Sequence, residues 1–302
     1  MHDVDIMMIG HFAKDKLVVG STSEVASGGG VYYGAIALRR MGVGVTVVTR
    51  LHAGDFPRLD ELRQAGVQVF ATPAPETSGI ENVYDPDDMD QRTCKPLGFA
   101  GPFRQDEIPA LTARVYMAVP IIAGEVDLPL LRWLAEQGPV GLDVQGFVRF
   151  PENGDLVSRP WPDISEGLAL VTYLKVDRVE AELLTGQTDL HTAARQLASY
   201  GPREIVVTQS SGVTVYIDGR VYQAPFTPRS LAGRTGRGDT CFATYVGKRL
   251  SAPPEEACRF AAALTSLKQE RPGPWQGTLD DVAAILADRY RSGVGGFEHP
   301  ID

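Results

Sequence analysis

The chain has 302 residues, of which 43% are hydrophobic and 22% are charged, so it has the composition of a globular protein with enough apolar residues for a core. A formal net charge of −9 argues against nucleic acid as the main partner, because a phosphate backbone requires a basic face. There is no apolar run near the about 20 residues of a membrane span and no signal peptide, and three widely spaced cysteines indicate reduced thiols, so we expect a cytoplasmic protein that binds no membrane.

Short apolar runs alternate with helical segments along the chain. The runs predict strands at 4–10, 43–49, 67–70, 115–120, 140–145, 168–175 and 204–209, and a hairpin around the turn Asp218-Gly219. Apolar periodicity predicts helices at 30–42, 58–66, 128–138, 179–186, 191–201, 240–250, 255–269 and 279–291. This alternation predicts an α/β fold with a mostly parallel central sheet, helices on both faces, and one domain over residues 1–302.

One region interrupts the alternation. Residues 78–103 have no helical period, and their segments 81–85 and 91–96 indicate two exposed strands around a Pro-Asp-Asp turn. Together with residues of the segment 12–22 they are expected to form a small β lid beside the main sheet, although an ordinary surface hairpin is the alternative. An exposed lid edge would offer a surface for a homodimer. The tail 292–302 is expected to be flexible.

Several motifs of other enzyme classes do not occur. The sequence contains no G-x-x-x-x-G-K-[ST], no G-x-G-x-x-G and no G-x-S-x-G segment. Its five histidines are not paired at the spacing of metal ligands. An NAD-binding oxidoreductase, a hydrolase with a nucleophile elbow and a zinc enzyme therefore have little support.

The segment GRTGRGDT at 233–240 is rich in glycine and arginine and leads into an apolar helix. Gly236 and Gly238 allow a tight turn, and the free N–H groups at the helix start form an anion site together with the helix dipole. Asp239 is either a simple N-cap or a base that takes a proton from a hydroxyl group. Amides that hold phosphate next to such a carboxylate suit phosphoryl transfer.

At this segment the chain resembles the PfkB (ribokinase-like) carbohydrate kinases, whose C-terminal signature is D-T-x-G-A-G-D-x-F. Residues 28–42, GGGVYYGAIALRRMG, are similar to the N-terminal segment of that family, G-G-x-x-x-N-x-A-x-x-L-x-x-L-G. Weaker matches follow in the same order as in the family, at 10–15, 49–56, 175–186 and 206–216. The resemblance spans about residues 4–270 and implies a ribokinase-like fold.

The resemblance also implies a function. Members move the γ-phosphate of ATP, with Mg²⁺, to a hydroxyl of a sugar or polyol such as inositol, or alternatively of a nucleoside. Asp239 would be the catalytic base, with an anion hole made by the amides of Gly236, Arg237 and Gly238. The acceptor site would include Asp15, Gly28, Gly29, Tyr33 and Arg234. The nucleotide site would include Thr208 and Gly212, and Glu180 would organise Mg²⁺ through water, although Glu180 also fits a capping pattern with Asp177.

The chain departs from the family pattern at several positions. Gly233 replaces the first Asp of the signature, which makes the monovalent-cation loop of some members doubtful here. Arg237 replaces Ala, and we expect it to supplement the anion hole or to hold an anionic acceptor. Tyr33 replaces Asn, and either it or Tyr32 could stack on a substrate or pack within the helix. These departures keep a non-catalytic ligand-binding protein as an alternative.

Overall fold

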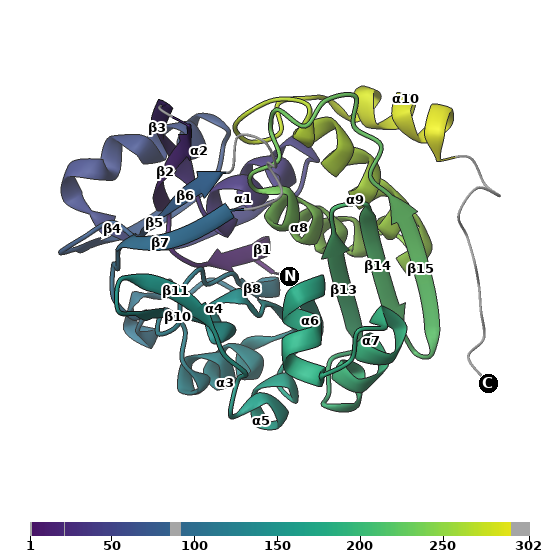
Figure 1. Cartoon of the computed structure of the whole chain (residues 1–302), viewed down its shortest axis with the longest axis horizontal. Coiled ribbons are helices and arrows are strands. Elements are labelled where there is room, and N and C mark those ends of the chain that lie inside the picture. Colours follow the sequence, from purple (N-terminus) through teal and green to yellow (C-terminus); the bar gives the residue numbers. More distant parts are fainter. Residues whose placement is uncertain (1, 21, 85–91, 291–302) are drawn as a thin grey trace.

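The computed structural model describes residues 2–20, 22–84 and 92–290 (Figure 1). The predicted Pro-Asp-Asp turn and the predicted flexible tail lie outside these residues. In the described part of the chain, a nine-stranded sheet has the order β15-β14-β13-β12-β9-β8-β1-β4-β5. Its strands are β1 (Val4–Ile9), β4 (Val45–His52), β5 (Gln68–Ala74), β8 (Ala113–Ala118), β9 (Val140–Asp143), β12 (Tyr173–Asp177), β13 (Glu204–Gln209), β14 (Gly212–Ile217) and β15 (Arg220–Pro225). All neighbours pair in parallel except those of the β13-β14-β15 meander at one edge.

Strands in the middle of the sheet bury both faces because apolar residues predominate in them, whereas the edge strands β5 and β15 are partly exposed. In β1, Ile6 and Met8 pack into one core, while Met7 and Ile9 pack into the other. The first core lies under α1 (Gly30–Arg40), α2 (Asp60–Gln64), α8 (Arg237–Arg249), α9 (Pro254–Gln269) and α10 (Leu279–Arg289). The second lies under α3 (Leu128–Gln137), α4 (Gln145–Val148), α5 (Ile164–Leu168), α6 (Arg178–Thr185) and α7 (Leu190–Ser199). The predicted fold class, a sheet between two helical layers, is confirmed (Figure 1).

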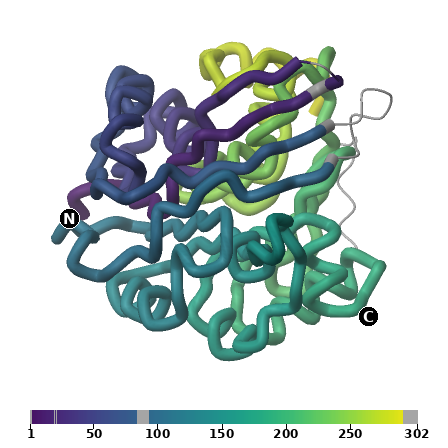
Figure 2. Tube along the Cα trace, turned by 60° about the vertical axis from the view of Figure 1, so that its left-hand side comes forward, coloured from purple at the N-terminus to yellow at the C-terminus, as the bar shows by residue number. Residues whose placement is uncertain are grey.

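A second sheet stands beside the first and has the order β3-β2-β6-β7. Its strands are β2 (Ala13–Val19), β3 (Thr22–Gly28), β6 (Gly79–Tyr84) and β7 (Arg92–Gly98). Figure 2 shows the four strands running side by side across one end of the molecule. The small sheet was predicted, but β3 was not, because most of its side chains are exposed and its sequence, TSEVASG, has no apolar alternation. Its role as a lid stays a prediction.

The connections between the two sheets meet at a buried histidine. His11, which follows β1, has its Nδ1 atom 2.6 Å from the Ser78 hydroxyl and its Nε2 atom 2.9 Å from the carbonyl oxygen of Gly101. Glu125 of the main body accepts the His11 backbone N–H at 3.2 Å. Burial lowers the pKa of His11 to about 3, so the ring is neutral. The three connections between the sheets that contain His11, Ser78 and Gly101 are therefore held together at this histidine, and Glu125 joins them to the rest of the protein.

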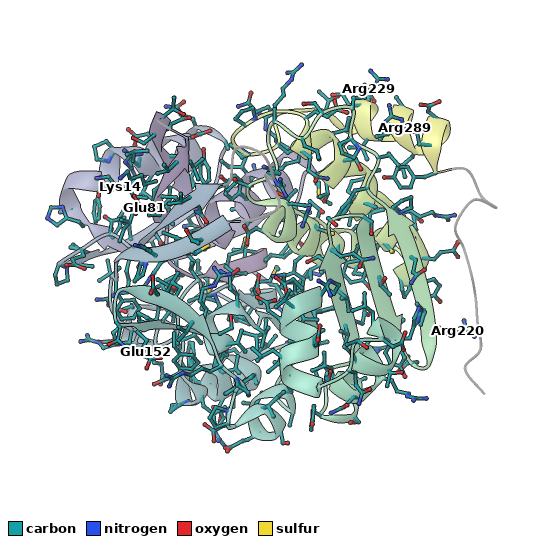
Figure 3. All side chains as sticks on the ribbon, in the orientation of Figure 1. Lys14, Glu81, Glu152, Arg220, Arg229 and Arg289 are labelled. Carbon is teal, nitrogen blue, oxygen red and sulfur yellow. The ribbon has the colours of Figure 1, made fainter. Side chains whose placement is uncertain are left out.

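The remaining differences from the sequence predictions are local. In the run 168–175 only residue 168 belongs to α5 and residues 173–175 to β12, with a connection between them at 169–172. A small hairpin, β10 (Arg149–Glu152) with β11 (Asp155–Ser158), was not predicted. The hairpin β14-β15 was predicted, and its turn residues Asp218 and Gly219 have positive φ angles of 49° and 79°. No described helix is both long and apolar enough to cross a membrane. In Figure 3, Lys14 and Glu81 lie on the small sheet, and Arg229 and Arg289 lie at the opposite, α10 end.

Candidate active site

The candidate site lies at the carboxyl ends of the central parallel strands. Asp143 ends β9 and is paired in register with Lys175 of β12, and Asp177 at the end of β12 is paired with Thr208 of β13. Helix α8, which carries Asp239 in its first turn, begins next to these strand ends. This is the edge at which open α/β sheets bind their ligands, and it brings together residues that are up to about a hundred positions apart in the sequence.

The loop before α8 brings Asp239 to the strand ends. Gly236 is the N-cap of α8 with a φ of 79°, a left-handed conformation that glycine adopts without strain. The first helical hydrogen bond is donated by Thr240 N–H to the Gly236 carbonyl at 3.0 Å. The N–H of Arg237 donates to the Arg234 carbonyl at 3.2 Å, so one of the three predicted anion-hole amides is engaged within the turn.

Gly238 lies close to two strand residues. A Cβ atom placed on Gly238 would lie 3.7 Å from Nζ of Lys175 and 3.8 Å from Oγ1 of Thr208. The predicted nucleotide-site residue Thr208 and the predicted anion-hole residue Gly238 are therefore neighbours. The predicted Gly212 lies in β14, where an added Cβ atom would meet the Ala224 carbonyl oxygen at 2.5 Å, so its environment is the adjacent strand.

Three consecutive glycines separate two carboxylates. A Cβ atom on Gly28 would lie 2.3 Å from Oδ2 of Asp15, and one on Gly30 would lie 3.4 Å from Oδ1 of Asp239. Gly29 between them has a φ of 92° and caps α1. Asp15 also accepts the Ile80 N–H at 2.9 Å, which ties it to β6 of the small sheet. Since glycine leaves no side chain in the way, a small ligand can approach the backbone between Asp15 and Asp239.

Lys175 is buried in a cluster of carboxylates. Its Nζ atom lies 3.1 Å from Oδ1 of Asp143 and 3.5 Å from Oε2 of Glu180. Glu180 also forms a capping box with Asp177: each side chain accepts the N–H group of the other residue. Burial lowers the pKa of Lys175, but Asp143, Glu180 and Asp177 more than offset this, so its pKa is raised and the ammonium is permanently charged.

The Asp239 carboxyl has its pKa raised above the ordinary value. Burial is the largest cause, and the positive charges of Lys175, Lys268 and Arg149 act in the opposite direction. Burial likewise raises the pKa of Glu180 to about 7. A carboxylate whose pKa is shifted toward neutrality is suited to accept a proton from a hydroxyl group, since a general base works best near the operating pH.

Of the predicted acceptor residues, Tyr33 supports the loop before α8 and Arg234 is part of it. Tyr33 is only 4% exposed, and its ring lies against Gly236, where a Cβ atom would meet the ring carbons at 2.3 to 2.5 Å. Lys268 of α9 lies over the same ring, with Nζ 4.8 Å from its centroid. Arg234 is half-buried in the loop itself. Direct contact of Tyr33 or Arg234 with an acceptor stays a prediction. Tyr32, the other candidate for stacking, is buried and donates its hydroxyl to Glu61 at 2.6 Å.

Sequence reasoning assigned no role to four residues of this site: Asp143, Arg149, Lys175 and Lys268. A separate depression of about 720 Å³ lies between the 104–112 loop and α3, with Trp133 and Tyr116 in its lining, and no predicted site residue borders it. The chemically useful groups therefore gather at the strand ends around Asp239 and not in this depression.

Comparisons with known proteins identify the family of the chain. The family model of the pfkB family carbohydrate kinases matches residues 144–279. A solved pyrophosphate-dependent kinase in the ribokinase family, complexed with a pyrophosphate analog and myo-inositol, is 38% identical with a TM-score of 0.86, over 92% of this chain and 99% of that one. The cytidine kinase of Thermococcus kodakarensis is 27% identical over 91% of this chain and 100% of its own length. The ribokinase of Arabidopsis thaliana, solved with ribose and ATP, is 20% identical with a TM-score of 0.75 over 94% of this chain and 98% of its own, and shares the fold.

Proposed function

The chain belongs to the pfkB family of carbohydrate kinases and is a phosphotransferase, and from this premise we propose that it phosphorylates a hydroxyl of an inositol-like polyol with Asp239 as the general base. The observation that carries the proposal is the position of Asp239. It lies in the first turn of α8, where a Cβ atom on Gly30 would be 3.4 Å from its Oδ1 atom, and the positive charges of Lys175, Lys268 and Arg149 act on its carboxyl group. A base next to several cations is what transfer of an anionic group to a hydroxyl requires.

The proposed reaction is a direct displacement. The acceptor lies between Asp15 and Asp239, and its hydroxyl proton passes to the Asp239 carboxylate as the oxygen attacks the terminal phosphorus of the donor. The bond from that phosphorus to the bridging oxygen breaks, and its electron pair leaves with the departing phosphate. The Gly238 amide in the first turn of α8 and the Lys175 ammonium stabilise the negative charge of the transferred group.

We propose inorganic pyrophosphate as the first candidate donor, with ATP, the donor expected from the sequence, as the alternative. Support comes from the 38% identity to a kinase described as pyrophosphate-dependent, against 20% to a ribokinase solved with ATP. The charge of the site agrees, since pyrophosphate offers no base or ribose and must be held by cations. Arg237, found where the family pattern has Ala, starts α8 with its guanidinium 6.0 Å from the Phe226 ring centroid.

Magnesium is compatible with the residues present if the donor supplies most of its ligands. Among the described residues, no cluster of three His, Cys, Asp or Glu side chains is arranged to hold a metal. Mg²⁺ in phosphoryl-transfer enzymes keeps several waters and binds one or two carboxylates together with substrate phosphates. Glu180 is the carboxylate that would contact it through water. Such an ion neutralises phosphate charge.

The proposal is tested by initial rates with pyrophosphate and with ATP against a panel of polyols, sugars and nucleosides. We expect turnover with myo-inositol, faster with pyrophosphate than with ATP. Arg237→Ala should raise the KM for the preferred donor by about tenfold, the scale of one lost charge-assisted contact. Absence of phosphorylated product with every pair would contradict the proposal.

A nucleoside kinase is the second candidate, supported by the full-length similarity to a cytidine kinase. The two tyrosines that could have stacked on a base are both buried and engaged in the structure, which favours the polyol. Turnover of cytidine at a higher kcat/KM than any polyol would establish the second candidate instead.

A further inference from the structure

A buried lysine of α9 forms hydrogen bonds with the loop between β15 and α8. Lys268 lies in the last turn of α9, and its side chain is directed to the loop. Its Nζ atom donates hydrogen bonds to the backbone carbonyls of Gly233 and Thr235. The ammonium therefore binds the peptide oxygens of the loop that leads to Asp239, and these are oxygen ligands of the kind that a bound alkali cation uses.

An aromatic ring completes the surroundings of this ammonium. The Tyr33 ring centroid lies 4.8 Å from Nζ of Lys268, a favourable cation–π distance. The same ring packs against Gly236. Lys268 and Tyr33, which come from α9 and α1, therefore hold the loop between them.

A monovalent metal ion does not fit this loop as it stands. Two of its carbonyl oxygens already accept from Lys268, and a second cation beside the ammonium would be repelled. Gly233 provides no carboxylate, and a Cβ atom at this position would lie 1.7 Å from the Arg271 carbonyl oxygen, so no larger side chain can be accommodated without a shift of the backbone.

We propose that the ammonium of Lys268 is a built-in cation that replaces a monovalent metal ion in the Asp239 loop, so that this kinase needs no potassium or sodium for activity. The inference rests on the proposed phosphotransfer at Asp239. Because Lys268 is attached to the chain, the loop is organised at any salt composition.

The consequence for the site follows from peptide geometry. In a trans peptide the C=O and N–H groups point in opposite directions. Lys268 fixes the carbonyl of Thr235, and it thereby fixes the N–H of Gly236, which points away from the ammonium. The Gly236 amide is one of the predicted anion-hole donors. Lys268 is thus a positioning residue, since it acts through the loop and not on the reacting atoms.

The first test is the cation dependence of turnover. Initial rates of the wild type are compared in about 0.1 M potassium, sodium or tetramethylammonium chloride, with the ionic strength held constant so that screening is equal. We expect rates that agree within about twofold, a difference below 0.5 kcal/mol. Activation of the wild type by potassium of about tenfold or more would overturn the proposal.

The second test removes the ammonium. Lys268→Met is expected to lower kcat by about 10- to 100-fold, the cost of a misplaced catalytic loop, and potassium or ammonium ions should restore part of the loss. Lys268→Gln, which keeps N–H donors without the charge, should behave in the same way. Lys248→Met is the matched control, because Lys248 makes a similar contact with the Phe260 ring at 5.3 Å but lies at the other end of α8. It should keep the wild-type rate.

Hydrogen exchange of residues 233–240 gives a measure that needs no turnover. Lys268→Met should exchange faster there, and potassium should restore protection, whereas Lys248→Met should match the wild type. If no donor supports turnover, the proposed function fails while this measurement still decides the role of Lys268. A Lys268→Met loop as protected as the wild type, or one that potassium does not affect, would overturn the proposal. Should neither Lys268 variant fold, a potassium-dependent gain of loop protection in the wild type would overturn it, and no change would support it.

Discussion

Two buried lysines act on Asp239, and they differ in their hydrogen-bond partners and in the direction of their pKa shifts. Lys175 of β12 is 4% exposed and Lys268 of α9 is 2% exposed, and both place positive charge near the Asp239 carboxyl. Lys175 is paired with carboxylates, and its pKa is raised. Lys268 is bound to backbone carbonyls, and burial lowers its pKa to about 7, although Asp239 opposes the change.

The difference shows that burial alone does not determine the state of an ionisable group. Desolvation disfavours both ammonium groups, but only Lys175 has neighbouring negative charges that overcome it. The site thus contains one fixed positive charge at the strand ends and one that titrates near neutral pH under the loop. Changes to each lysine should therefore have different consequences.

The largest effect on stability is expected from Lys175→Met. The substitution leaves the Asp143 and Glu180 carboxyls buried without a counter-charge, which costs about 3–5 kcal/mol of unfolding free energy. Chemical denaturation measures the loss. Adding Asp143→Asn to the variant should recover part of it, because one uncompensated charge is removed. A loss below about 1 kcal/mol in the single variant would mean that the cluster does not hold Lys175 as described.

A smaller effect is expected where the loop meets the end of α9. Gly233→Ala would bring a methyl group against the Arg271 carbonyl, so we expect a loss of about 1–3 kcal/mol and a displaced Lys268 contact. Gly54→Ala is the control, since its added Cβ atom would meet only the ring of His52, which is exposed. Equal thermal stability of the two variants would show that the close approach at Gly233 does not constrain the loop.

The smallest expected effect is on the pH dependence of kcat, which should report the titration of Lys268 and not that of Lys175. Lys268 is charged below its pKa of about 7 and loses its charge as the pH rises, so turnover should fall on the alkaline side. The other charged groups that act on it are Asp239 and Arg237, and Asp239 must be ionised, so turnover should also fall at acid pH. Lys268→Arg keeps the charge and should lose only the alkaline fall. If kcat of this variant still falls at alkaline pH as in the wild type, a group other than Lys268 causes the fall.

Much of the fold could be predicted because it depends on local patterns. Uninterrupted apolar runs gave the parallel strands, 3.6-residue periodicity gave the helices, and the Asp218-Gly219 turn gave the edge hairpin. The polar strand β3 could not be found in this way, because its pairing with β2 is supplied by tertiary structure and its exposed side chains have no pattern to read.

The candidate site could be predicted only where it coincides with short motifs. The glycine-rich segment identified Asp239 and its neighbour Gly238, and Gly238 lies beside Lys175 and Thr208 at the strand ends. Lys175 belongs to the matched segment 175–186, but nothing in its local sequence shows that Asp143 faces it. Lys268 had one available signal, since it falls four residues after Leu264 on the apolar face of α9, where an exposed lysine is not expected.

The most direct test of the account is phosphorus NMR of wild type and Asp239→Asn incubated with the preferred donor and acceptor. Wild type should produce a phosphomonoester of the acceptor, and the variant should be slower by about 10²- to 10⁴-fold, the contribution of a general base, while donor affinity measured by calorimetry stays within about threefold. Product formation by Asp239→Asn at a rate near that of the wild type would contradict the assignment of Asp239 as the base of this kinase.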